Sequence, residues 1–150
     1  MATVEKSIEV EVPVTTAYNQ WTQFELFPRF MDGVEAVEQR DDTHLHWRAR
    51  VAGKEKEWDA EITEQTPDQR IAWRSTDGAP NAGVVTFHKL NDSTTKVMLQ
   101  VDAEPEGLME KAGDVAGVLD RRVEGDLERF KDFVEHRGAE TGAWRGTVDR

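Results

Sequence analysis

A long amphipathic stretch near the C-terminus, residues 108–134, limits what this chain can fold into more than any other feature. Its apolar residues recur at alternating steps of three and four, which places them on one stripe of an α-helix. The stripe comprises Leu108, Ala112, Val115, Ala116, Leu119, Val123, Leu127, Phe130 and Val134. With a rise of about 1.5 Å per residue, this helix would be about 40 Å long. Such a helix needs a large apolar surface to lie on, and the preceding chain must supply it.

The first 40 residues predict one strand, two short helices and a second strand. Residues 4–12 alternate between apolar and polar side chains, which is typical of a half-buried strand. A short helix is expected over residues 14–21. A second is expected around residues 27–31, although Pro28 interrupts the pattern. The next strand begins at Val34.

From residue 43 to residue 103 the pattern is that of consecutive hairpins. Short alternating segments are separated by turn residues such as Asp77-Gly78 and Asn91-Asp92 at regular spacing. The chain therefore predicts an α+β fold, with an antiparallel sheet packed on the long C-terminal helix. Its length of 150 residues is typical of one domain.

Composition excludes several classes of function. Charged residues make up 33% of the chain and the net charge is -11, so nucleic acid and anionic membrane surfaces are repelled. There is no cysteine, hence no disulfide and no thiolate ligand or nucleophile. Neither an export signal nor an apolar run of about 20 residues is visible. We therefore expect a cytoplasmic protein without nucleic-acid binding or membrane insertion.

The sequence resembles the polyketide cyclase/dehydrase group of the START-like superfamily, also called Bet v 1-like or SRPBCC. The segments that carry the resemblance are PVTTAYNQWTQFELFPRFMDGVEAVE, EKEWDAEITEQTPDQRIAWRSTDG, GVVTF and GLMEKAGDVAGVLDRRVEGDLERFKDFVE. The resemblance implies a helix-grip fold over residues 1–137, with a curved antiparallel sheet of about seven strands around the C-terminal helix. It also implies a cavity for hydrophobic ligands between sheet and helix. Residues 138–150 form a tail, either frayed or packed back through Trp144 on the domain or a second subunit.

Three tryptophans are the first candidates for a ligand-binding wall. Trp47, Trp58 and Trp73 lie on consecutive expected strands, with the alternation pointing all of them inward. Side chains of this size either fill a core or line a pocket, and both alternatives are open here. Residues 27–31 resemble the cavity-entrance helix of the family, where soft apolar side chains adapt to a guest. The full predicted site is Phe27, Phe30, Met31, Trp47, Trp58, Trp73, Phe87, Val115, Leu119 and Val123.

The polar candidates point to no defined catalytic chemistry. His44 and His46 share the outward face of one strand, but no third ligand converges on them, so we expect no metal and no cofactor. Asp126 falls at the edge of the helix stripe, either as an exposed partner of Arg122 or as a cavity acid of raised pKa. No nucleophile–base pattern or phosphate loop is present.

The sequence thus favours binding of a small hydrophobic or aromatic, polyketide-like molecule. Whether this binding serves a cyclase or dehydratase step stays open. The alternatives are a non-catalytic carrier of lipid or quinone, and a START-like protein-interaction domain. A homodimer is a further option that the sequence leaves open.

Overall fold

The computed structural model of the chain describes residues 2–31, 33–51, 54–78, 81–103, 115–137, 142 and 145–148. Its elements are β1 (Ala2–Val10), α1 (Val14–Trp21), the 3-10 helix η1 (Phe24–Arg29), β2 (Val34–Gln39), β3 (His44–Val51), β4 (Lys54–Thr66), β5 (Arg70–Gly78), β6 (Asn81–Asn91), β7 (Thr94–Ala103) and α2 (Val115–Arg137). This order confirms the predicted α+β fold with two short helices after the first strand. Residues 108–114, the expected first turns of the long helix, lie outside the described residues.

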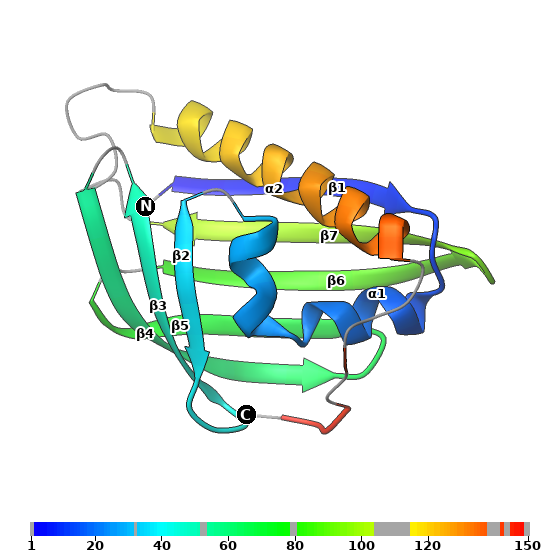
Figure 1. The fold of residues 1–150 in the computed structure, drawn as a ribbon, viewed down its shortest axis with the longest axis horizontal. Helices are drawn as coiled ribbons and strands as arrows, with labels where there is room; N and C mark the ends of the chain where they lie inside the picture. Colours follow the sequence, from blue (N-terminus) through cyan, green and yellow to red (C-terminus); the bar gives the residue numbers. More distant parts are fainter. Residues whose placement is uncertain are drawn as a thin grey trace.

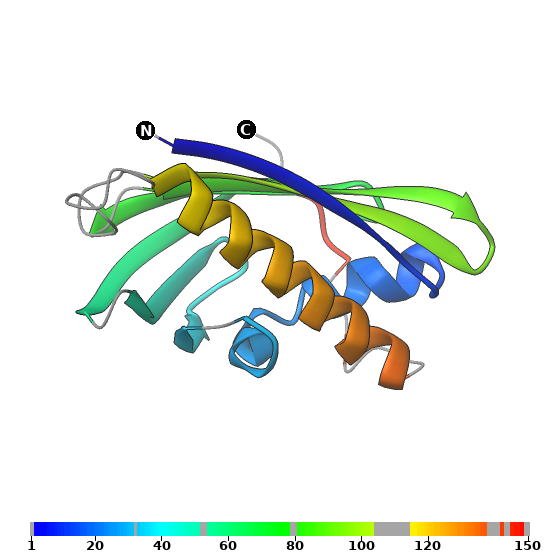
Figure 2. The ribbon, with the colours of Figure 1, turned by 90° about the horizontal axis from the view of Figure 1, so that it is seen from above.

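The seven strands form one antiparallel sheet in the order β1-β7-β6-β5-β4-β3-β2. Strands β2 to β7 pair with their neighbours in sequence, and only β1 pairs out of order, with β7. The sheet curves, and α2 runs diagonally across its concave side (Figures 1 and 2). The helix-grip architecture is thereby confirmed, because the long helix lies on the concave side of the curved sheet.

Helix α2 buries the last part of the predicted stripe. Val123, Leu127, Phe130 and Val134 are all at most 4% exposed. The Phe130 ring lies 4.8 Å from that of Trp21 on α1 and 5.4 Å from that of Phe30, centroid to centroid. Edge-on aromatic pairs at such distances stabilise a core beyond their buried area. The packed core therefore sits where α2 crosses α1 and η1.

The described part of the tail packs back on the domain. Val148 forms an antiparallel bridge with Gln65 of β4, through backbone hydrogen bonds of 2.8 and 2.9 Å. This bridge extends the sheet beside β4, beyond the point where β3 begins at His44. Trp144, the residue that the sequence singled out in the tail, lies outside the described residues. Val148 thus holds the described part of the tail through its backbone pair with Gln65.

Arg145 fixes the same segment to two elements. Its guanidinium donates to Asn19 Oδ1 of α1 at 2.7 Å and pairs with Asp68 Oδ2, in the β4–β5 turn, at 2.9 Å. We expect Arg145→Ala to lower the free energy of unfolding by about 1–2 kcal/mol, because charge-assisted bonds to a buried amide are lost. Urea unfolding measures this, and the exposed Arg121→Ala should stay within about 0.5 kcal/mol of the wild type. Equal stability of the two variants would show that the tail contributes nothing.

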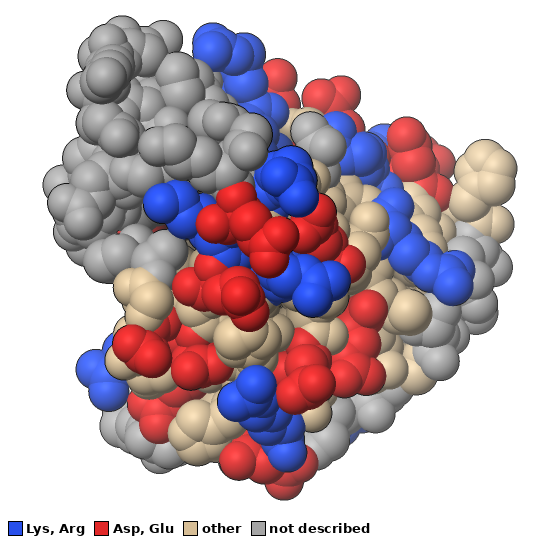
Figure 3. Space-filling model, turned by 60° about the vertical axis from the view of Figure 1, so that its left-hand side comes forward, with Lys and Arg blue, Asp and Glu red and all other residues tan. Residues whose placement is uncertain are grey.

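Within the described part of the chain, no helix combines the length and apolar content that crossing a membrane requires. The sheet's outer surface on the side of β2, β3 and β4 carries acidic and basic side chains interspersed, without a broad patch of one sign (Figure 3).

Candidate ligand-binding site

Two of the predicted tryptophans form a stacked pair on the concave face of the sheet. Trp47 on β3 and Trp58 on β4 lie directly opposite each other in the strand register. Their rings are 5.7 Å apart and inclined by only 10°. Trp47 is buried at 6% exposure, and Phe27 of η1 packs on it at 5.6 Å. Trp58 is only half-buried, so part of its surface stays accessible beside the core.

Trp73 extends this concave surface onto the neighbouring strands. It lies on β5 opposite Gly83 of β6. A Cβ at Gly83 would collide with the benzo ring of the indole, so the ring lies against the glycine backbone. Trp73, like Trp58, is partly buried and packs against the edge of the core. The concave face thus offers two large aromatic side chains that the packed core does not fully cover.

The remaining predicted residues divide between this wall and the core. Phe87 is 5% exposed and contacts Tyr18 at 5.4 Å and Trp21 at 6.3 Å, inside the cluster under α1. Val123 is 4% exposed on α2. The side chains of Val115 and Leu119, one to two turns before it, lie outside the described residues. Phe87 and Val123 therefore contribute packed surface, while the tryptophans contribute accessible surface.

Phe30 and Met31 border a hollow of about 400 Å³ between α2 and the connection from η1 to β2. Its lining residues are Pro28, Arg29, Phe30, Met31, Gly33, Val34 and Arg129. Sequence reasoning placed Phe30 and Met31 at a cavity entrance and missed Arg129, which lies outside the apolar stripe of its helix. No local pattern marks Arg129, because only the packing of α2 against η1 brings it to the hollow.

Arg129 links the two sides of the hollow. Its Nε donates to the backbone carbonyl of Phe30 at 2.8 Å, and its Nη2 pairs with Asp126 Oδ1 at 2.6 Å. The Asp126 side chain is 12% exposed. This carboxylate therefore has an ion pair with Arg129, one turn after it on α2. The pair holds α2 against η1 beside the opening.

The buried polar groups near the aromatic wall include two indole N–H groups. The indole N–H groups of Trp47 and Trp21 are buried and have no hydrogen-bond partner. An unpaired buried donor costs about 1–3 kcal/mol of stability. The phenol of Tyr18 stays protonated, because burial raises its pKa. Among the described residues, no group of three or more histidines and carboxylates is placed to hold a metal ion.

Comparison with known proteins agrees with this geometry. The sequence profile described as "Polyketide cyclase / dehydrase and lipid transport" matches residues 10–132. An uncharacterized 17.2 kDa protein from Streptomyces lincolnensis is 62% identical over 149 residues, covering 99% of both chains.

Two solved structures show the same fold. The Zhui aromatase/cyclase from Streptomyces sp. R1128 superposes with a TM-score of 0.74 at 18% identity, over 95% of this chain and 98% of its own. A START superfamily protein from Mycobacterium smegmatis superposes with a TM-score of 0.69 at 15% identity, over 91% and 97%. The profile match spans most of the chain and the relative nearly all of it. The chain therefore belongs to the polyketide cyclase/dehydrase and lipid transport family, on a START-like fold.

Proposed function

We propose that this protein binds a small hydrophobic or aromatic molecule between the concave face of its sheet and helix α2. The observation that carries the proposal is the half-buried state of Trp58 and Trp73 on that face, next to the stacked Trp47. Large aromatic surface left accessible beside a packed core is typical of ligand pockets. Phe27, Val115, Leu119 and Val123 would complete the apolar wall, with Phe87 supporting it from the core.

The ligand class that we favour is a flat, carbonyl-bearing molecule of polyketide type. Stacked indoles suit a planar ligand. The family description, which includes polyketide cyclases, supports the same class. The ligand would enter through the hollow beside Phe30 and Met31, whose apolar side chains can change conformation to admit it.

A carrier role is the second candidate, because the family description also includes lipid transport. In a carrier, the same wall would hold the guest without changing it. In a cyclase or dehydratase, the wall would fold a flexible chain, and nearby donors would stabilise an enolate oxygen. Turnover of a poly-β-keto substrate separates the two roles. A homodimer and a cytoplasmic location stay predictions.

The test is a fluorescence titration with an apolar aromatic probe such as 1-aminoanthracene, beside native mass spectrometry of protein purified from its own host. We expect Trp58→Ala to weaken probe binding about tenfold or more, since stacking area is lost while the half-buried position limits the loss of stability. Leu119→Ala and Val123→Ala should also reduce the affinity. The control is Leu90→Ala at the β6–β7 hairpin, where the side chain is 49% exposed. Probe binding that is unchanged in all the site variants would rule out this site.

A further inference from the structure

The outer face of the β3–β4 hairpin carries a ladder of opposite charges. On β3 the outward residues are His44, His46, Arg48 and Arg50, and the residues directly opposite them on β4 are Glu61, Asp59, Glu57 and Glu55. Each cationic or titratable side chain of β3 thus has an acidic residue across the strand pair. Opposite charges directly across a strand pair stabilise the pairing, and like charges destabilise it. The cationic side of the ladder includes His46, so its charge depends on pH.

The geometry around His46 favours a doubly protonated imidazole ring. Its Nδ1 lies 2.7 Å from Asp59 Oδ1 and its Nε2 lies 2.8 Å from Glu57 Oε1. A neutral imidazole has a single N–H, so it can donate to only one carboxylate. Both contacts are satisfied only in the imidazolium form. Two further charges face this group: Glu38, opposite it on β2, and Arg40, which reaches Asp59 at 3.9 Å.

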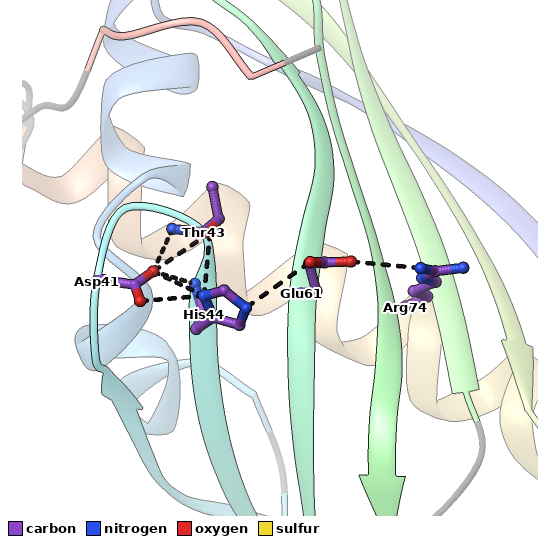
Figure 4. A network of polar contacts seen from close by, with 5 residues as sticks. All are labelled: Asp41, Thr43, His44, Glu61 and Arg74. Carbon is purple, nitrogen blue, oxygen red and sulfur yellow. Dashed lines mark hydrogen bonds and ion pairs between the residues drawn. The ribbon is translucent and has the colours of Figure 1, made fainter. Parts of the chain in front are cut away.

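His44 forms the adjacent rung (Figure 4). Its Nδ1 lies 2.9 Å from Asp41 Oδ1, and its Nε2 lies 3.7 Å from Glu61 Oε2. Arg74 of β5 reaches the other oxygen of Glu61 at 3.4 Å. Hydrogen bonds from the Thr43 backbone N–H and from His44 lower the pKa of Asp41 to about 2. This carboxylate therefore stays ionised over the pH range in which His46 titrates.

The same hairpin carries the aromatic wall on its other face. Trp47 lies between His46 and Arg48 along β3, and its stacking partner Trp58 lies between Glu57 and Asp59 along β4. The two carboxylates that clamp His46 thus flank Trp58 in the sequence. We propose that the β3–β4 hairpin is a proton-operated clamp, in which protonated His46 fixes the strand pair that presents Trp47 and Trp58 on the concave face. The effect on ligand binding rests on the function proposed above.

The direction of the pH effect follows from the contacts. The carboxylates of Asp59 and Glu57 raise the pKa of His46 above its ordinary value, against a smaller effect of burial. The stabilisation that protonated His46 provides is therefore present in full at pH values below the pKa of this histidine in the unfolded chain, about 6.5. This stabilisation is lost as the pH rises through the higher pKa of His46 in the folded protein. Above that point one carboxylate lacks its donor, and the outer face gains negative charge.

Three proteins test the clamp: the wild type, His46→Gln and the control His88→Gln. His88 is an exposed histidine on β6 whose Nε2 lies 3.0 Å from Thr86 Oγ1, a neutral partner. Nuclear magnetic resonance follows the imidazole of His46 and the indole signals of Trp47 and Trp58 from about pH 5.5 to 9, the range that brackets histidine titration. In the wild type and in His88→Gln, the two indole signals should shift with the same midpoint as His46. In His46→Gln that shift should disappear.

Thermal unfolding gives an independent measurement. At about pH 5.5 the melting temperature of His46→Gln should lie about 2–4 °C below that of the wild type, and near pH 9 the two should coincide. Asp59→Asn should likewise reduce the stabilisation that the wild type gains at about pH 5.5, because it removes one of the two carboxylate charges that face His46. Indole signals that do not respond to pH would overturn the proposal. So would a difference in melting temperature between the wild type and His46→Gln that is the same at both pH values.

Probe titration separates this inference from the proposed function. The wild type should bind 1-aminoanthracene about fivefold more weakly near pH 9 than at about pH 6.5, and His46→Gln should show no such change. A probe that binds at neither pH contradicts the proposed function, while the resonance and melting data still decide on the clamp. Equal affinity at the two values in the wild type would contradict the link between the clamp and the ligand wall.

Discussion

Phe130→Ala should lower the free energy of unfolding by about 3–5 kcal/mol, a large fraction of the about 5–15 kcal/mol typical of a domain. The side chain is 0% exposed and lies where α2 crosses α1 and η1. Its ring makes edge-on contacts with Trp21 at 4.8 Å and Phe30 at 5.4 Å. Truncation leaves a cavity among rigid aromatic rings, which cannot collapse to fill it. Urea unfolding at neutral pH measures the change.

The matched control for this prediction is Phe133→Ala, one turn further along α2. Phe133 is only partly buried and packs on Phe30 at 5.5 Å, from the edge of the core. Its truncation should therefore cost clearly less than that of Phe130. If both variants lost the same stability, α2 would not have the sharply defined inner stripe that we describe.

Gly78→Ala should be the second most damaging single change, with an expected loss of about 2–4 kcal/mol. Gly78 ends β5 with a φ of 87°, in the left-handed region where a Cβ itself costs about 1–2 kcal/mol. The added Cβ would also collide with the backbone carbonyl of Glu57 and with Cα of Trp58. These are backbone atoms inside β4, so the collision can be relieved only by moving the strand that carries Trp58.

Gly125→Ala on α2 is the matched control, and the opposite sign is expected for it. No left-handed φ occurs at Gly125, and its added Cβ would meet only the flexible end of the Arg129 side chain, at 3.0 Å. Alanine is favoured over glycine inside a helix by up to about 1 kcal/mol. Thermal unfolding of the two variants measures both effects. A destabilised Gly125→Ala would show that Arg129 cannot yield without loosening its bond to Phe30.

The element order of this fold could be predicted because each element leaves a local periodic signature. The three-and-four spacing from Val123 to Val134 marks a buried helix stripe, and these residues are buried. Alternation in β3 places Leu45 and Trp47 on one face and His44 and His46 on the other, and the exposures follow it. The spacing of apolar residues within one segment is enough to predict which of its side chains are buried, without knowing which other segment covers them.

The site could be predicted only in part, because its geometry depends on pairing between distant strands. Trp47 and Trp58 were assigned to one face, but their stacking requires the β3–β4 register that sets them directly opposite. The role of Gly83 follows only from its position under Trp73. Arg129 and Phe30, 99 residues apart in the chain, meet at the hollow because α2 packs across η1.

By itself the sequence determined the α+β class, the long helix, the hairpins and the inward placement of the tryptophans. These properties follow from hydrophobic periodicity, which each segment carries independently of the others. The tertiary structure alone decided which charges pair across the outer face. Both carboxylates at His46 lie on β4. The alternation pattern within each strand does not show how β3 and β4 are aligned with each other. The tertiary structure also decided that Arg145 and Val148 pack at the end of β4. A short tail without hydrophobic periodicity is positioned only by its contacts with the rest of the domain.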